Sequence, residues 1–217
     1  MKAAKEGFEL LDIKDVDRNV QHLFSDVLQE DEHGRLWANY YDENNNIIDH
    51  EIWSISKLKL SSGGILSFST AHSLSARSLY VSDSVANLIL FVQSYASRFS
   101  WEYAAFIATG TKLDRDLFME AVGKYPYVKK HYSVYGHSLI GRVRDCKVQH
   151  WLNGEDCFFR TDGEMVVACY QGKDFRLAVS RFSLRNHLRQ LGLRQNLKTK
   201  KPRTTILGNF SITSAGM

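Results

Sequence analysis

The sequence has no long apolar run, and this absence restricts the class of protein it can be. The apolar stretch at residues 88–92 is bounded by Asn87 and Gln93. That is far short of the roughly 20 residues that a membrane-spanning helix needs. Residues 1–7 carry charge where a secretory signal would be apolar. We therefore expect no membrane association and a cytoplasmic location.

Cysteine is also scarce. Cys146, Cys157 and Cys169 are odd in number and spaced too widely for a CxxC metal site. They are typical of buried or inert thiols in a reducing compartment. The 8 histidines are scattered along the chain, so the sequence predicts neither a zinc site nor any other cofactor.

Three common catalytic signatures are missing as well. No Gly-x-Ser-x-Gly segment is present for a serine hydrolase. The glycine-rich segment Ser62–Gly64 follows no convincing strand and opens no helix, unlike a dinucleotide-binding turn. The loop Gly136–Gly141 lacks the Gly-Lys-Ser/Thr end of a P-loop. Each absence weakens an enzymatic interpretation.

What the chain does have is a core-forming composition and an uneven charge. Its 217 residues are 44% hydrophobic and 12% aromatic, which is ample for a packed interior. The net charge of +4 is modest, but the first 60 residues are comparatively acidic and the C-terminal part is basic. From residue 173 on, a single acid, Asp174, is set against Lys173, Arg176, Arg181, Arg185, Arg189, Arg194, Lys198, Lys200, Lys201 and Arg203. This asymmetry indicates a basic end that faces a polyanion.

The first part of the chain predicts a small α+β extension over residues 1–76. Apolar residues at helical spacing predict a helix over residues 8–30. Residues 36–53, with a turn at residues 42–46, predict a β-hairpin. A further short strand is expected at Ile65–Phe68.

Strands and helices alternate from residue 78 onward. We expect strands at 79–81, 104–108, 132–135 and 165–170, and helices near 84–97, 114–125, 142–152 and 180–191. Such alternation is typical of βαβ units on a mainly parallel sheet. The sequence thus predicts an α/β domain over residues 77–197, with a sheet flanked by helices, and a basic, flexible tail over residues 198–217.

Three segments carry a family resemblance: Leu79–Leu88, Phe106–Gly110 and Tyr132–Arg142. Together they resemble the toprim fold, and more closely the toprim-like proteins carried on bacterial mobile elements beside primase-type genes. The resemblance covers residues 78–170, with a weaker similarity at Tyr40–Trp53. In that family one strand ends in an acidic residue that opens a helix, and a later strand ends in Asp-x-Asp-x-x-Gly.

The resemblance places the family's motif on five residues of this chain. The acid of the first motif falls on Asp83, and a later Asp of the same motif falls on Asn87. With Gly141 as the anchor, the two Asp positions of the second motif fall on Gly136 and Ser138. Magnesium prefers oxygen ligands, carboxylates among them, and the phosphoryl transfer expected of the family depends on that ion. The resemblance therefore implies a degenerate site with no metal ligand set and no catalytic residue.

Other interpretations of this site stay open. Asp83 could simply be the N-cap of the helix that follows it. His137 could act as a base, although it has no recognisable acid partner in the sequence. A divergent metal-dependent nuclease or primase-type enzyme could use Asp83 together with Asp145.

The basic end gives a positive prediction. Arg181, Arg185 and Arg189 recur every fourth residue and are expected to form one stripe on a helix. The charge continues through Arg194, Lys198, Lys200, Lys201 and Arg203. Such a surface suits binding to a phosphate backbone, although an ordinary solvated helix face explains the same pattern.

From these observations we expect a catalytically degenerate toprim-like protein that binds nucleic acid, DNA more than RNA. The resemblance implies an accessory role in the replication or transfer of mobile-element DNA, with a protein partner from such a complex. Two alternatives are the divergent metal-dependent enzyme and a protein-interaction module that uses the former active-site face.

Overall fold

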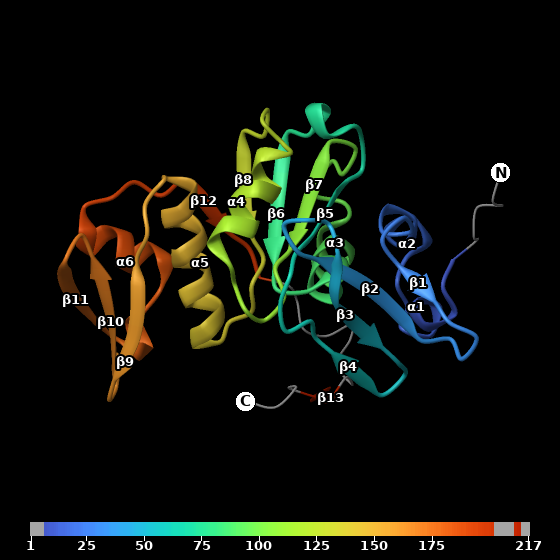
Figure 1. Cartoon of the computed structure of the whole chain (residues 1–217), viewed down its shortest axis with the longest axis horizontal. Helices are drawn as coiled ribbons and strands as arrows, with labels where there is room; N and C mark the ends of the chain where they lie inside the picture. Colours follow the sequence, from blue (N-terminus) through green and yellow to red (C-terminus); the bar gives the residue numbers. More distant parts are fainter. Residues whose placement is uncertain (1–6, 202–210, 214–217) are drawn as a thin grey trace.

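A computed structural model describes residues 7–201 and 211–213 of the chain. Within this part the fold is mixed α/β, and its three sheets follow one another along the long axis of the molecule (Figure 1). Among the described residues, no helix combines the length and the hydrophobicity that crossing a bilayer requires.

The central sheet has the strand order β12-β8-β6-β7-β5. Its strands are β5 (Leu66–Ser69), β6 (Ser78–Ser82), β7 (Ala104–Ala108), β8 (Lys130–Ser133) and β12 (Leu197–Thr199). All pairs are parallel except β5 with β7. The prediction that the three middle strands pair in one mainly parallel sheet, with a helix after each, is confirmed.

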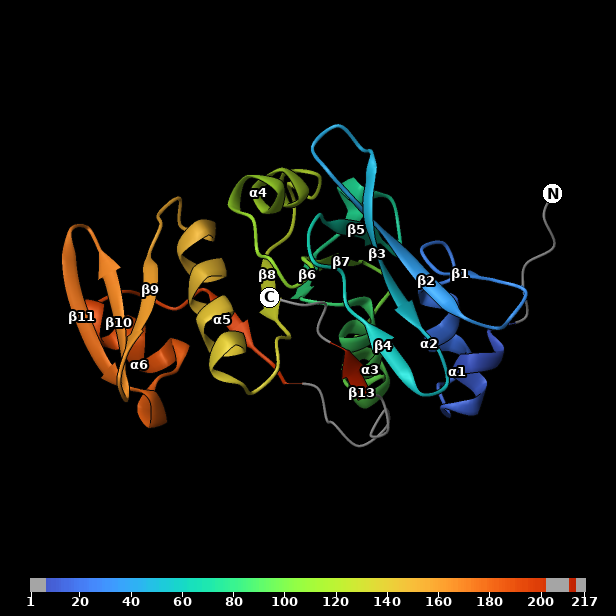
Figure 2. The same cartoon turned by 60° about the horizontal axis from the view of Figure 1, so that its bottom comes forward.

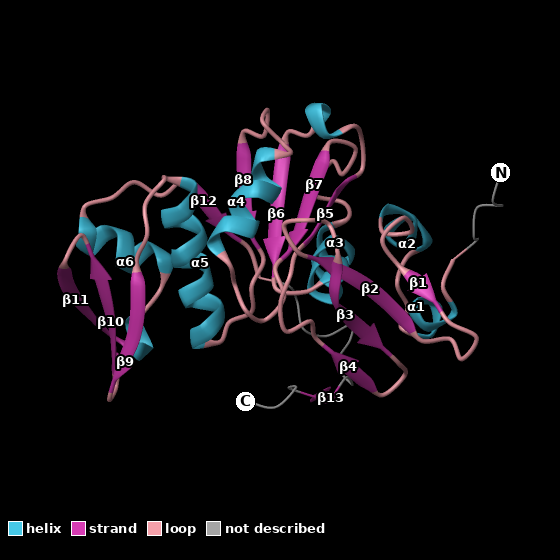
Figure 3. Cartoon of the chain, in the orientation of Figure 1, coloured by secondary structure: helices cyan, strands magenta, loops and turns pink. Residues whose placement is uncertain are grey.

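Helices cover both faces of this sheet because the strands are apolar on both sides. Tyr80 and Phe106 point toward α3 (Val85–Tyr95), whereas Leu79 and Ile107 point toward α4 (Arg115–Gly123) and α5 (Leu139–Leu152). Successive strand residues thus belong to two different cores, as the alternation of side chains along a strand requires. Figure 3 shows the helices grouped around the strands.

The predicted N-terminal hairpin is present as β2 (Leu36–Tyr41) and β3 (Ile47–Trp53). It is extended by β1 (Gln29–Glu30), β4 (Lys57–Lys59) and β13 (Ser211–Thr213). The single helix expected over residues 8–30 is wrong. The chain forms α1 (Glu9–Ile13) and α2 (Arg18–Leu23), because Asp15 has a left-handed φ of 54° and the Asp17 side chain caps a new helix.

A buried carboxylate ties this hairpin to α3. Glu51 accepts hydrogen bonds from the backbone N–H groups of Val85 (2.8 Å) and Ala86 (3.0 Å), which open the helix. It also accepts from the Tyr40 hydroxyl (2.7 Å) and the Trp53 indole (2.8 Å). Burial raises the pKa of Glu51 to about 7, and these four donors oppose that rise.

Elements from the two sides of residue 76, where the sequence predicts a boundary, pair with one another. Strand β5 lies before that boundary, yet it pairs with β7 in the central sheet. Phe24 and Phe68 from the first part also pack their rings against Phe106, with centroids 5.3 and 5.1 Å away. The N-terminal elements and the central sheet therefore share one core.

The C-terminal part forms a separate small sheet. Strands β9 (Phe158–Asp162), β10 (Met165–Tyr170) and β11 (Lys173–Ala178) are antiparallel, so the strand expected at 165–170 exists outside the parallel sheet. The α6 helix (Leu184–Leu191) packs beside them, and α5 lies between this unit and the central sheet (Figure 2). Two 3-10 turns, η1 (Ser73–Ser75) and η2 (Val179–Arg181), complete the elements described.

The chain then returns to the central sheet instead of leaving it as a tail. Lys198 lies in β12, and the backbone N–H of Lys200 donates to the Ser133 carbonyl at 2.8 Å. Residues 198–201, the first of the predicted tail, thus lie along the edge of the sheet, whereas residues 202–210 and 214–217 of that tail lie outside the described residues.

Candidate nucleic-acid interface at the strand ends

The candidate site lies where β6, β7 and β8 end. Because the three strands are parallel, their carboxyl ends meet at one edge, which is where open α/β sheets bind ligands. Thr109 joins these ends: its hydroxyl donates to the Ser82 carbonyl at 3.2 Å and lies 3.2 Å from the Tyr135 hydroxyl. Burial raises the pKa of Tyr135 well above its usual range, which keeps this phenol neutral.

Asp83 follows β6 directly, and both of its carboxylate oxygens are engaged. Oδ1 accepts from the Asn87 side-chain amide at 2.7 Å and from the Ser82 hydroxyl at 3.3 Å. Oδ2 accepts from the guanidinium of Arg144 at 2.6 Å. The Asp83 and Arg144 side chains are only 14% and 11% exposed, so the ion pair is largely shielded from water.

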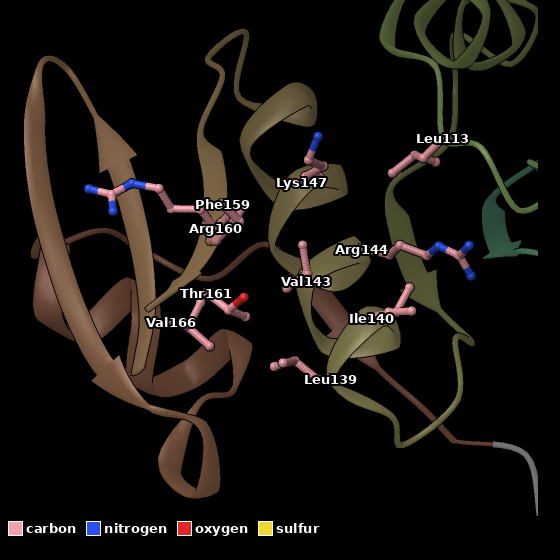
Figure 4. A pocket seen from close by; sticks show the side chains of 10 residues that line it. All are labelled: Leu113, Leu139, Ile140, Val143, Arg144, Lys147, Phe159, Arg160, Thr161 and Val166. Atoms are coloured by element: carbon pink, nitrogen blue, oxygen red, sulfur yellow. The ribbon is translucent and has the colours of Figure 1, made fainter. Parts of the chain in front are cut away.

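Arg144 is itself fixed in place. Its second amino group donates to the Thr111 carbonyl, and its guanidinium lies over the Tyr135 ring, 5.6 Å from the centroid. Figure 4 shows the side chain extending from α5 away from β9 and Phe159. The charge of the Asp83 carboxylate is thus balanced by Arg144, a cation of the protein itself.

The N-cap interpretation of Asp83 is wrong. Ser84 caps α3, and its hydroxyl accepts from the Asn87 backbone N–H at 3.0 Å. The Asp83 carboxylate does not cap the helix; it points toward Arg144, with which it forms an ion pair.

Two of the three loop positions of the second motif, Ser138 and Gly141, have structural roles. Ser138 caps α5 by accepting from the Gly141 N–H at 3.1 Å. A Cβ atom on Gly141 would lie 2.2 Å from the Gly136 carbonyl oxygen, so glycine is required at 141 for the loop to approach the helix. Among the described neighbours, nothing lies within 4 Å of a Cβ built on Gly136.

Asp145 is paired separately. Its carboxylate accepts from the Ser133 hydroxyl and from the Lys201 ammonium, the latter at 2.7 Å. Lys201 also donates to the Gly136 carbonyl at 3.3 Å. Burial raises the pKa of Asp145, and the charge of Lys201 opposes that rise. Asp83 and Asp145 thus each hold a cation of their own.

Beside Asp145 the surface opens into a pocket of ≈ 280 Å³, which we name the basic pocket. Its charged lining consists of Arg142, Arg185 and Lys201 against the single carboxylate of Asp145, and the exposed His137 lies at the same opening. Arg142 is held by bonds to the carbonyls of Val179 (3.0 Å) and Phe182 (2.7 Å). Three cations therefore surround one carboxylate here.

The other predicted basic residues are distributed more widely. Arg185 and Arg189 are exposed on α6, but Arg181 precedes that helix in η2, so the expected stripe of three on one helix is wrong. Arg194 and Lys198 are exposed, and Lys200 is partly buried. Arg203 lies outside the described residues.

Two site residues were missed in the sequence. Arg142 and Arg144 follow Gly141 at alternate positions, so one points to the basic pocket and the other to Asp83. The signal was the segment Gly-Arg-Val-Arg-Asp, which places two cations just after Gly141. The toprim resemblance implies a metal at these positions, and a metal predicts carboxylates instead of cations.

A second pocket, of ≈ 400 Å³, lies between α5 and β9; its lining is mainly apolar but includes Arg144, Lys147 and Arg160. Figure 4 shows Val143 of α5 and Phe159, Thr161 and Val166 of the small sheet around it. Ile140 and Phe158, on α5 and β9, are exposed by 64% and 66%.

No protein-family model and no curated protein matches the chain. Among solved structures, the primase fragment of the bacteriophage T7 primase-helicase protein is similar in fold, with a TM-score of 0.39 and 10% identity over 64% of this chain and 58% of that one. A second is from the T7 lagging-strand DNA polymerase interacting with primase domains bound to an RNA/DNA hybrid and dTTP. It has a TM-score of 0.33 and 9% identity over 57% of this chain and 65% of that one.

The chain spans less than two thirds of the length of either neighbour.

Proposed function

We propose that this protein binds the phosphate backbone of nucleic acid at the carboxyl ends of its parallel strands without using a metal ion. The observation that carries this proposal is the basic pocket, in which Arg142, Arg185 and Lys201 face one buried carboxylate. Arginine and lysine donors held around a pocket suit phosphate oxygens.

The absence of metal chemistry follows from the pairing of the carboxylates. A divalent ion at Asp83 would have to displace Arg144, whose guanidinium already neutralises the charge. Asn87 and the loop residues Gly136 and Ser138 offer no further carboxylate. A site of this kind has lost most of its attraction for magnesium. We therefore propose a catalytically degenerate toprim-like protein.

Exposed cations extend the basic surface beyond the pocket. Arg189, Arg194 and Lys198 are all exposed on the segment that runs from α6 to the sheet edge. Contacts of this sort are independent of base sequence and release counterions. The toprim resemblance extends the proposal to DNA as the preferred ligand, and to an accessory role, beside a protein partner, in the replication or transfer of mobile-element DNA.

The test is the salt dependence of binding to single- and double-stranded DNA and RNA. Arg185, Arg189 and Arg194 are replaced together by Gln. The first two lie in α6, which should persist because Arg and Gln are nearly equal in helix propensity, and Arg194 lies beyond the end of that helix. Each lost phosphate contact should reduce the log–log salt slope by about one unit. We expect weaker binding to unrelated sequences by a similar factor.

A matched control uses two exposed arginines that are already paired with acids. Arg160 bonds to Asp174 at 2.5 Å, and Arg176 bonds to Asp162 at 3.1 Å, both on the small sheet. Changing these two to Gln should leave affinity and slope unchanged. If the wild type binds no nucleic acid at low salt, the proposal fails and a protein-interaction role takes its place. Metal-dependent cleavage of the nucleic acid would instead establish the enzymatic alternative.

A further inference from the structure

A buried cluster of two histidines and one cysteine lies far from the strand ends. His150 is in the last turn of α5, Cys157 precedes β9, and His187 is in α6. All three are 0% exposed, and one ligand atom of each lies within 4.8 Å of the other two. The Nε2 atoms of the two histidines are 2.9 Å apart. Three segments that are separated in the sequence thus bring one possible ligand atom each to the same buried place.

The surroundings of His150 favour a lone pair directed into this cluster. Its Nδ1 faces Oε2 of Glu155 at 3.6 Å, and within the described part of the chain neither atom has a hydrogen-bond partner. Oε1 of Glu155 accepts from the Tyr170 hydroxyl at 2.7 Å, which orients the carboxylate. A carboxylate behind one imidazole nitrogen keeps the proton there and leaves the other nitrogen free as a ligand. Carboxylate–histidine pairs of this kind commonly support bound zinc.

Both imidazoles are fully buried, and burial disfavours their charged form. Neutral imidazole is the form that binds a metal. Among the residues that the structure describes, Nδ1 of His187 also has no hydrogen-bond partner.

We propose that His150, Cys157 and His187 bind a zinc ion, with water in the fourth position. Zinc takes nitrogen and sulfur ligands in tetrahedral geometry, at about 2.0–2.1 Å and about 2.3 Å. Such bond lengths place two ligand nitrogens roughly 3.4 Å apart, so the pair seen at 2.9 Å has to open by only about half an ångström. The Cys157 thiol loses its proton to solvent on binding, because the ligand is the thiolate. The proton that joins the two Nε2 atoms moves to Nδ1 of His187, so that both Nε2 lone pairs can bind the ion.

The ion would fasten the small C-terminal unit to α5. His150 is on the helix, whereas Cys157 and His187 belong to the unit of β9–β11 and α6. This inference is independent of the proposed nucleic-acid binding, because none of the three residues lines the basic pocket.

The experiment uses the full chain, freed of metal by a chelator and titrated with Co²⁺ and Zn²⁺. Co²⁺ should produce a thiolate charge-transfer band and the d–d bands of tetrahedral coordination, saturating at one ion per chain. Excess Zn²⁺ should abolish both and should raise the melting temperature, because it binds the folded state. Elemental analysis of the reloaded protein should give one zinc per chain.

Two variants and one control complete the test. Cys157→Ser should lose the charge-transfer band, and His187→Gln should weaken Co²⁺ binding at least tenfold. Cys169→Ser should bind as the wild type does, since Cys169 is paired across the strands with the exposed Phe158. Residues directly opposite on two strands share a face.

The proposal is overturned if the wild type binds no stoichiometric Co²⁺, or if its Co²⁺ complex has no thiolate band. It is overturned equally if Cys157→Ser keeps that band. The wild-type titration decides the matter even if a variant fails to fold.

Discussion

The Gly136 carbonyl oxygen lies 2.2 Å from the place where a Cβ atom on Gly141 would stand. Because the Gly136 oxygen belongs to the backbone, it cannot move away by a rotamer change, as a flexible side chain could. We expect Gly141→Ala to lower the free energy of unfolding by roughly 1–3 kcal/mol, the usual cost of overpacking. Urea denaturation followed by circular dichroism measures the change.

Gly123 provides the matched control for this substitution. It ends α4, and a Cβ built there has nothing within 4 Å among the described residues. Gly123→Ala should therefore stabilise the protein by about 0.4–1 kcal/mol, through the entropy of the unfolded chain. Equal effects at 123 and 141 would contradict the close approach of the loop to α5.

The pair of Asp83 and Arg144 should behave as a coupled unit. Removing one partner of a shielded ion pair leaves the other charge uncompensated, so Asp83→Asn and Arg144→Gln should each cost about 3 kcal/mol. The double variant should cost clearly less than the sum. A double-mutant cycle in urea measures the coupling.

The exposed pair of Arg160 and Asp174 is the control for this cycle. These side chains are 57% and 43% exposed, and such pairs contribute about 0–1 kcal/mol. Additive costs at Asp83 and Arg144 would show that the two side chains do not depend on one another.

Millimolar Mg²⁺ should leave the melting temperature unchanged. With Arg144 bonded to Asp83, the strand edge offers no free carboxylate for the ion, and stabilisation by a ligand requires a concentration well above its dissociation constant. Differential scanning calorimetry with and without Mg²⁺ measures this. A rise that disappears in Asp83→Asn would restore the metal-dependent alternative.

The raised pKa of Glu51 predicts that the stability of the protein depends on pH. Its pKa rises from 4.5 to about 7 on folding, so between these values the folded protein holds more protons than the unfolded chain. Stability linked to Glu51 is therefore complete below about pH 4.5 and is lost as the pH rises through 7. The full change amounts to roughly 3 kcal/mol.

Glu51→Gln should remove this slope and should also lower stability at every pH. Glutamine offers one acceptor oxygen in place of two, so a buried donor such as the Trp53 indole or the Ala86 N–H loses its partner, at about 1–3 kcal/mol. Glu32→Gln is the control, since that side chain is 86% exposed. An unchanged slope in Glu51→Gln would assign the pH dependence to another group.

The parallel strands could be predicted because each is short, apolar and followed by helix-forming sequence. Leu79–Val81 and Ala104–Ala108 are apolar at consecutive positions, as strands buried on both faces are. The helix predicted over residues 8–30 failed for a local reason. The left-handed backbone of Asp15 breaks the helical spacing without interrupting the apolar pattern.

The candidate site was harder to predict because its pairs join distant segments. Arg144 and Asp83 are 61 residues apart, and Lys201 and Asp145 are 56 apart. Similarly, His150 and His187 are scattered in the sequence but meet when α6 packs against α5. The spacing of residues within one segment cannot predict contacts between segments that are distant in the sequence. The basic composition of the C-terminal part did predict exposed cations there, and Arg185, Arg189, Arg194 and Lys198 are exposed.

The return of the chain to β12 has a consequence for biosynthesis. The edge strand leaves the ribosome only after the whole β9–β11 and α6 unit, so the nascent central sheet stays one strand short until then. During that interval Asp145 has not yet formed its ion pair with Lys201, and the basic pocket lacks the part of its lining that Thr199 and Lys201 provide. If the basic pocket binds phosphate as proposed, the nascent chain should acquire that binding only after β12 has docked, so assembly of the scaffold would precede binding.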